Sequence, residues 1–123
     1  MKENLKIYIC GPIRHVSDPD VCAQVMEQFD SVQKMLTENF AKCNPKIFNP
    51  MHNGLCPCEP RAEHIHTDII NLMECDCMYV MDGWQTSSVC VNELMIAYQL
   101  GINILNRIDE FKISLTFSPN HKM

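Results

Sequence analysis

The sequence predicts an α/β domain built on a doubly wound parallel sheet of four to five strands. Two observations predict it. Short apolar runs alternate with longer segments of helical period along the chain, an order that builds a parallel sheet with helices on both faces. The length of 123 residues fits a single domain, 1–123. Ligands bind such sheets beyond the carboxyl ends of the strands, so we expect the active or binding cleft there.

The first half of the chain predicts a strand, a long helix and a second strand. Residues 5–10 (LKIYIC) are apolar, with β-branched and aromatic side chains, and Gly11 ends the run. A helix starts at residues 17–19, where capping oxygens precede a proline. Apolar residues then recur at the helical period for about five turns. Asn44-Pro45 breaks this helix before a short strand at 46–48.

The middle of the chain predicts a loop, a helix and a third strand. Residues 51–62 are rich in Gly and Pro and lack any period, which indicates a loop. The helix that follows carries Ile65, Ile69, Leu72 and Met73 on one face and ends near Cys75. Residues 77–81 (CMYVM) are the third strand, and Asp82-Gly83 turns the chain.

The last predicted helix is capped by Ser87 or Ser88 and stopped by Gly101. Residues 102–105 are the fourth strand, and residues 111–117 give a fifth strand or an ordered tail.

Composition limits the partners. The net charge of −5 and the pI of about 5.4 argue against a nucleic-acid backbone or an anionic membrane as the main partner. A small phosphorylated ligand remains compatible with this charge, because one Arg and one helix N-terminus can hold a phosphate. The sequence shows no secretory signal and no apolar run of about 18–20 residues. We therefore expect a cytoplasmic protein whose eight cysteines are reduced.

Glu93 is the most informative candidate residue. Its neighbours on the last predicted helix, three and four positions away, are Val89, Cys90, Ile96 and Ala97, so the carboxylate lies on an apolar face. An unpaired buried charge is costly, which favours either a function or a buried ion pair for this carboxylate.

Asp68 and Tyr8 are weaker candidates from pattern alone. Asp68 has His64, His66 and Asn71 as helix neighbours, which indicates a solvated face. Tyr8 lies within the first strand, where a tyrosine is usually a core residue.

A phosphate could be bound by the Arg14 guanidinium together with the helix start at Ser87 and Ser88, although helix caps and a surface Arg are the ordinary interpretations.

A metal site needs weighing because Cys and His residues cluster in the middle of the chain. The cysteines are spaced C-x-C twice, whereas tetrahedral zinc is typically held by C-x₂-C. We therefore predict no metal. There is also no GxGxxG motif and no Walker A loop, so we expect no nucleotide cofactor. The cluster consists of Cys56, Cys58, Cys75, Cys77, His52, His64 and His66.

Four segments in this order resemble the nucleoside 2-deoxyribosyltransferase superfamily, and most closely its small DUF4406-type members and the deoxynucleoside 5′-monophosphate N-glycosidases. The resemblance spans roughly residues 5–105. It implies a flavodoxin-like or Rossmann-like three-layer sandwich that cleaves the N-glycosidic bond of deoxynucleosides or their monophosphates. The segments are IYICGPIR (7–14), HTDIINLMECD (66–76), MDGWQTSSVCVNE (81–93) and AYQLG (97–101).

The resemblance also implies roles. Glu93 would attack C1′ and form a deoxyribosyl-enzyme, Asp68 would lie near the sugar and the departing base, and Tyr8 would position the catalytic carboxylate. Two carboxyls in one apolar cleft should have pKa values pushed apart, leaving one ionised and one protonated. Substrate-binding residues implied by the matching segments are Gly11, Ile13, Arg14, Gly83, Trp84 and Ser87.

The same resemblance implies a homodimer or larger homo-oligomer that acts on a small-molecule nucleoside or nucleotide. Val89-Cys90 stand where relatives often have Gly-Ala, and valine narrows the space in front of the helix. This departure keeps a second hypothesis open, a non-catalytic nucleotide-binding or regulatory domain. A Cys/His metal-binding module is the third.

Overall fold

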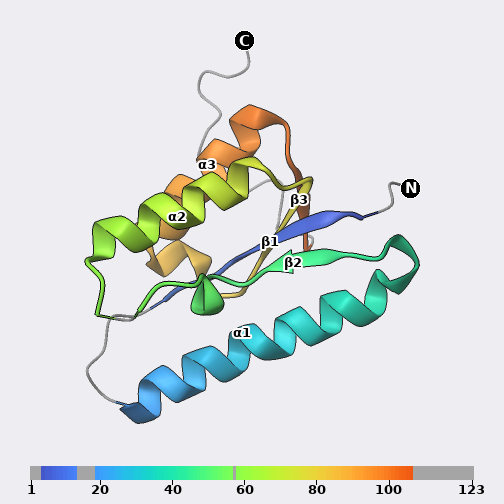
Figure 1. Cartoon of the computed structure of the whole chain (residues 1–123). Helices are drawn as coiled ribbons and strands as arrows, with labels where there is room; N and C mark the ends of the chain where they lie inside the picture. The colour runs from blue at the N-terminus through green and yellow to red at the C-terminus, as the bar shows by residue number, and fades with distance from the viewer. Residues whose placement is uncertain (1–3, 14–18, 57, 107–123) are drawn as a thin grey trace.

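The computed structural model describes residues 4–13, 19–56 and 58–106, and within them the predicted α/β fold is confirmed. Four parallel strands form one sheet in the order β2-β1-β3-β4 (Figure 1). The strands are β1 (Lys6–Cys10), β2 (Lys46–Phe48), β3 (Cys77–Val80) and β4 (Asn103–Leu105). The predicted segment 111–117 lies outside the described residues.

In the described part of the chain, three helices cover the sheet, and three short 3₁₀ turns join the elements. Figure 1 shows α1 on one face and α2 and α3 on the other, which gives the three-layer arrangement. Each crossover joins two parallel strands, and the change of face between α1 and α2 makes the sheet doubly wound. The helices are α1 (Pro19–Asn39), α2 (Arg61–Met73) and α3 (Ser88–Leu100), and the turns are η1 (Ala41–Cys43), η2 (Pro50–His52) and η3 (Trp84–Thr86).

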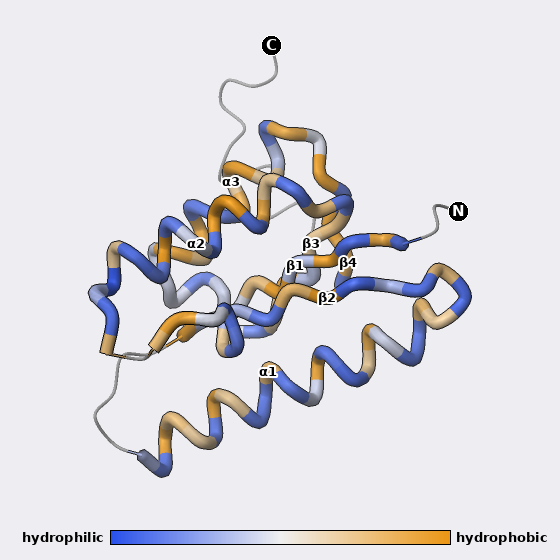
Figure 2. Tube along the Cα trace, in the orientation of Figure 1, coloured by the Kyte–Doolittle hydropathy of each residue, from blue (hydrophilic) through white to orange (hydrophobic). Residues whose placement is uncertain are grey.

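Alternation along β1 divides the interior into two cores. Ile7 and Ile9 pack toward α1 with Phe29, whereas Tyr8 and Cys10 pack toward α2 and α3. All four strand side chains are fully buried because β1 lies inside the sheet and both of its faces are covered. Figure 2 shows the matching pattern on the helices, where hydrophobic and hydrophilic residues alternate along the tube.

The predicted limits of α3 are confirmed. The Ser87 side chain accepts a hydrogen bond from the Cys90 N–H, which satisfies one of the free amides of the first turn. Gly101 ends the helix at φ 74°, a left-handed conformation that glycine adopts without strain. The predicted cap of α1 at 17–18 lies outside the described residues.

No helix in the described part of the chain has both the length and the apolar character needed to cross a bilayer.

Gly11 follows β1, and the neighbouring residues Met81 and Phe29 leave no room for a side chain at this position. A Cβ at this position would lie 2.5 Å from Met81 Sδ and 3.0 Å from Phe29 Cζ. Phe29 is fully buried, so the contact can be relieved only by moving Met81 or the helix.

We therefore expect Gly11→Ala to lower the free energy of unfolding by about 1–3 kcal/mol, measured by urea denaturation. Gly54→Ala is a contrasting variant that measures backbone strain without a clash, since nothing lies within 4 Å of its Cβ position and its φ is +90°. An unchanged midpoint for Gly11→Ala would show that this packing is loose.

Candidate functional site

Tyr8 and Glu93 meet between the sheet and α3. The Tyr8 hydroxyl donates a 2.8 Å hydrogen bond to Glu93 Oε2. Both side chains are buried, with 0% and 4% of their surface exposed. The apolar helix face predicted around Glu93 is thus an interior face. Among the described residues, Glu93 forms no ion pair, and its partner is a neutral hydroxyl.

Burial controls the acid–base properties of this pair. It raises the pKa of Glu93 from 4.5 to about 7, against the hydrogen bond from Tyr8, while the charge of Asp68 raises it further. The pKa of Tyr8 is held well above its ordinary value, first by burial and then by the charge of Glu93. Near neutral pH, Glu93 can therefore gain or lose a proton, while Tyr8 remains a hydrogen-bond donor.

Asp68 is buried on α2, and the prediction of a solvated face was wrong. Only 6% of its surface is exposed, because the loop that follows β2 packs over this part of the helix. Burial raises the pKa of Asp68 from 3.8 to about 6, against a hydrogen bond from Asn53 and the charge of His64. The charge of Asp68 in turn raises the pKa values of both Tyr8 and Glu93. The structure therefore brings Tyr8, Asp68 and Glu93 into one electrostatic environment.

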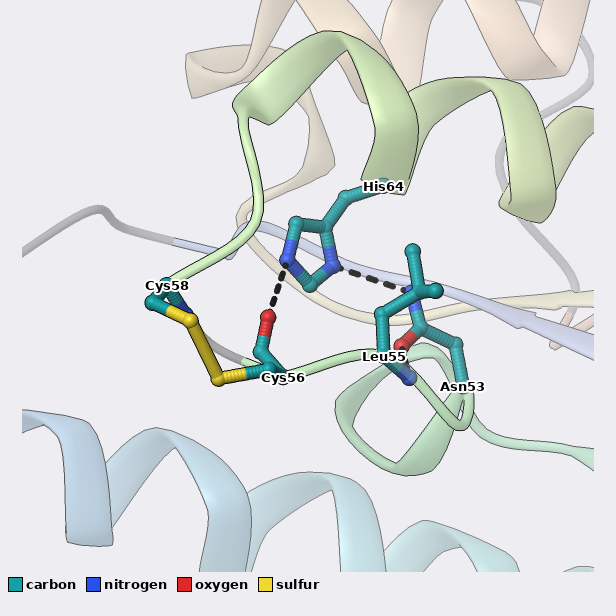
Figure 3. Close-up of a disulfide and its surroundings, with 5 residues drawn as sticks. All are labelled: Asn53, Leu55, Cys56, Cys58 and His64. Carbon is teal, nitrogen blue, oxygen red and sulfur yellow. Dashed lines mark hydrogen bonds between the residues drawn. A yellow bond between two sulfur atoms is a disulfide. The ribbon is translucent and has the colours of Figure 1, made fainter.

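Asn53 and His64 are the residues at this site that sequence reasoning missed. Asn53 follows η2, and its Nδ2 lies 3.1 Å from both Asp68 Oδ1 and His64 Nδ1. His64 Nε2 lies 3.2 Å from the carbonyl oxygen of Cys56 (Figure 3). The loop 51–62 lacks any period, and the only available signal was that two histidines precede Asp68 on the same predicted helix.

The predicted residues of the first loop are only partly described. Gly11 is buried, and the space next to it faces Met81 and Phe29 rather than the α3 side of the sheet. Ile13 has 37% of its surface exposed at the carboxyl end of β1. Arg14 lies outside the described residues.

The segment after β3 approaches the segment after β1. A Cβ on Gly83 would lie 3.5 Å from Pro12, and Gly83 has a φ of 88°. Trp84 is 7% exposed and packs in the core beneath α3, so its ring is largely covered. Ser87 Oγ accepts the Cys90 N–H at 3.2 Å, and Val89 in the first turn of α3 is half-buried.

The prediction that all eight cysteines are reduced was wrong. Cys56 and Cys58 form a disulfide in the loop before α2 (Figure 3), so not all eight cysteines are reduced. Cys10, Cys22, Cys43, Cys75, Cys77 and Cys90 are thiols outside this disulfide. The disulfide occupies two sulfurs that the metal-binding hypothesis would have used, and among residues 4–13, 19–56 and 58–106 no three His, Cys, Asp or Glu side chains are grouped as metal ligands.

Two further features, a hydrogen-bonded cluster and a surface hollow, lie away from this site. Asn49 donates to Asp30 and Gln33 of α1, and His52 Nε2 lies 2.9 Å from Asp30, which together tie η2 to α1. A hollow of about 470 Å³ lies on the α1 side of the sheet. Its walls are Glu27, Gln28, Ser31, Val32, Tyr79, Met81, Asp82 and Asn106. The hollow is therefore on the opposite face of the sheet from Glu93.

Comparison with known proteins gives one assignment. No curated protein sequence matches the chain. The family model for a domain of unknown function, DUF4406, matches residues 5–106, which is most of the chain, and the protein therefore belongs to the DUF4406 family.

Proposed function

We propose that this protein cleaves the N-glycosidic bond of deoxynucleosides or deoxynucleoside monophosphates, as a hydrolase or a deoxyribosyltransferase, through a covalent intermediate on Glu93. The observation that carries the proposal is the buried hydrogen bond from Tyr8 to Glu93, together with a second buried acid, Asp68, whose charge acts on both. The pKa is raised to about 6 for Asp68 and to about 7 for Glu93. Burying two acids in one region is costly for stability, and such sites are often functional.

The first half of the reaction uses both acids. As the bond between C1′ and the base breaks, its electron pair moves to the base nitrogen and positive charge develops on the sugar. Ionised Glu93 stabilises this charge and bonds to C1′, while the proton of Asp68 neutralises the departing base. Tyr8 donates to Glu93 Oε2, which orients the carboxylate and favours its ionised form.

The second half reverses these roles. A water molecule or a second base attacks C1′, and the bond to Glu93 breaks with its electron pair returning to the carboxylate. Asp68, now ionised, takes the proton that the attacking group loses. The protein ends with one ionised and one protonated acid, as it began.

The pKa values bear on which acid holds the proton. Two interacting acids that titrate at about 6 and about 7 share one proton between these pH values, and apparent values belong to the pair. The reaction needs the singly protonated form in which the proton lies on Asp68 and Glu93 is ionised, and we propose that this form is the reactive one.

The proposal is tested by incubating the protein with a panel of deoxynucleosides, their 5′-monophosphates and the corresponding ribonucleosides. We expect free base to be released from at least one deoxy substrate, detected by chromatography, and a deoxyribosyl adduct on Glu93 when the reaction is quenched in acid and analysed by peptide mass spectrometry. The ribonucleosides are the matched control. Absence of release from every deoxy substrate would contradict the proposal.

A non-catalytic nucleotide-binding domain is the second candidate. Half-buried Val89 in the first turn of α3 favours it, because a side chain there narrows the approach to Glu93. The same panel separates the two functions: calorimetric binding of a nucleotide without release of base would favour this second candidate.

A further inference from the structure

Asn53 makes three hydrogen bonds within the protein, and together they fix which way its amide points. Its Oδ1 accepts from the Leu55 N–H at 3.1 Å. Its Nδ2 lies 3.1 Å from Asp68 Oδ1 and 3.1 Å from His64 Nδ1. Rotating the amide by half a turn would place the NH₂ group against the Leu55 N–H and the oxygen against the carboxylate, so both contacts would be repulsive.

The tautomer of His64 follows from the same contacts. A carbonyl oxygen can only accept, so the 3.2 Å contact with Cys56 requires the proton on Nε2. An amide NH₂ can only donate, so in the neutral form of His64 the Nδ1 atom offers its lone pair to Asn53. His64 is thus held between Cys56 and Asn53, as the two dashed lines in Figure 3 show. The disulfide from Cys56 to Cys58 lies beside the carbonyl that starts this chain.

The donor capacity of the Asn53 amide is therefore fully used. Both amide hydrogens and one lone pair have protein partners, which leaves no donor for a substrate. Asp68 is different: only Oδ1 accepts from Asn53, and no bond to Oδ2 is found within the described residues. The described residues therefore leave Oδ2 as the oxygen of Asp68 that is open to another partner.

We propose that Asn53 and His64 are positioning residues for Asp68, which hold Oδ1 so that Oδ2 faces the reacting base. This inference rests on the proposed function for its catalytic meaning. The chain of contacts runs from the Cys56 carbonyl through His64 and Asn53 to the carboxylate. Neither residue touches the substrate, and both act only through Asp68.

The first test needs no substrate. The pKa of Asp68 is measured by carboxyl-carbon NMR in the wild type, Asn53→Ala and His64→Ala, with His66→Ala as the control on the exposed side of the same helix. The hydrogen bond from Asn53 lowers the pKa of Asp68, so we expect this pKa to rise above about 6 in Asn53→Ala, to rise less in His64→Ala and to stay unchanged in His66→Ala. An unchanged Asp68 pKa in both Asn53→Ala and His64→Ala would overturn the positioning role, whether or not base release is found.

The second test is a double-mutant cycle on base release. We expect Asn53→Ala to reduce kcat by about ten- to a hundredfold with a smaller change in KM, because the acid is misdirected while the substrate contacts remain. In an Asp68→Asn background the same substitution should have little further effect. Equal losses in both backgrounds would show that Asn53 only supports the fold. His64→Gln, which can offer an acceptor to Asn53 and a donor to Cys56, should recover part of the loss seen in His64→Ala.

Discussion

Glu93→Gln is expected to reduce base release by about a thousandfold or more, which is the largest change in activity that we predict. The amide cannot form the bond to C1′ and carries no charge to oppose the positive charge on the sugar. Its shape is unchanged, and its carbonyl oxygen can still accept the hydrogen bond from Tyr8. The measurement is the initial rate of base formation on the best substrate of the panel, together with the loss of the covalent adduct.

The matched control is Glu38→Gln, which makes the same chemical change on an exposed position of α1. Its rate should equal that of the wild type. If Glu93→Gln kept more than about a tenth of the wild-type rate, Glu93 would not be the nucleophile, because removal of a covalent catalyst costs several orders of magnitude.

The same substitution is expected to stabilise the fold at alkaline pH. The pKa of Glu93 is about 7 in the folded protein and 4.5 in its ordinary environment, so the folded state binds this proton more tightly. Stability from this group is therefore complete below about pH 4.5 and is lost as the pH rises through 7. At about pH 8 the ionised carboxylate costs on the order of 3 kcal/mol, from about 1.4 kcal/mol for each pH unit of the shift. Glutamine removes this cost.

The measurement is the free energy of unfolding of the wild type and Glu93→Gln by urea denaturation at several values between about pH 4.5 and 8. We expect the two curves to separate as the pH rises, with the variant more stable at the alkaline end. The free energy of unfolding of the variant still falls as the pH rises, because Asp68 is present and its pKa is raised from 3.8 to about 6. Parallel curves for the two proteins would show that Glu93 is not buried in solution.

Together, the two expected results mean that Glu93 is needed for activity but lowers the stability of the fold. A carboxylate kept for structure alone would not lower stability at neutral pH and would not lie beside a second buried acid. Gain of stability with loss of base release is therefore the combined result that our proposal requires.

The elements that sequence predicted well are those with strong local signals. The four strands and three helices follow from apolar runs and helical periods, and the ends of α3 follow from Ser87 and Gly101. Glu93 was identifiable because it interrupts an apolar helix face. In each case the residues that carry the signal are close together in the sequence.

Asp68 shows why the rest could not be predicted. Its helix neighbours are polar, yet Asp68 is buried, and its carboxylate is bonded to the loop residue Asn53, which lies outside the helix. Asn53 and the bridge from Cys56 to Cys58 lie in a segment without any period, where spacing gives no information on contacts. The homodimer or larger homo-oligomer implied by the resemblance and the cytoplasmic location expected from the sequence stay predictions.

The position of β1 has a consequence for synthesis on the ribosome. This strand is followed by α1 and β2, which can pair with it early as a complete unit. Within the described residues, its other edge, from Ile7 to Cys10, pairs with β3, so this pairing must wait until residues 77–80 have been made. During that interval the nascent chain carries an open apolar strand edge, which is a template for intermolecular association. Slow translation ahead of β3 should therefore favour aggregation over folding.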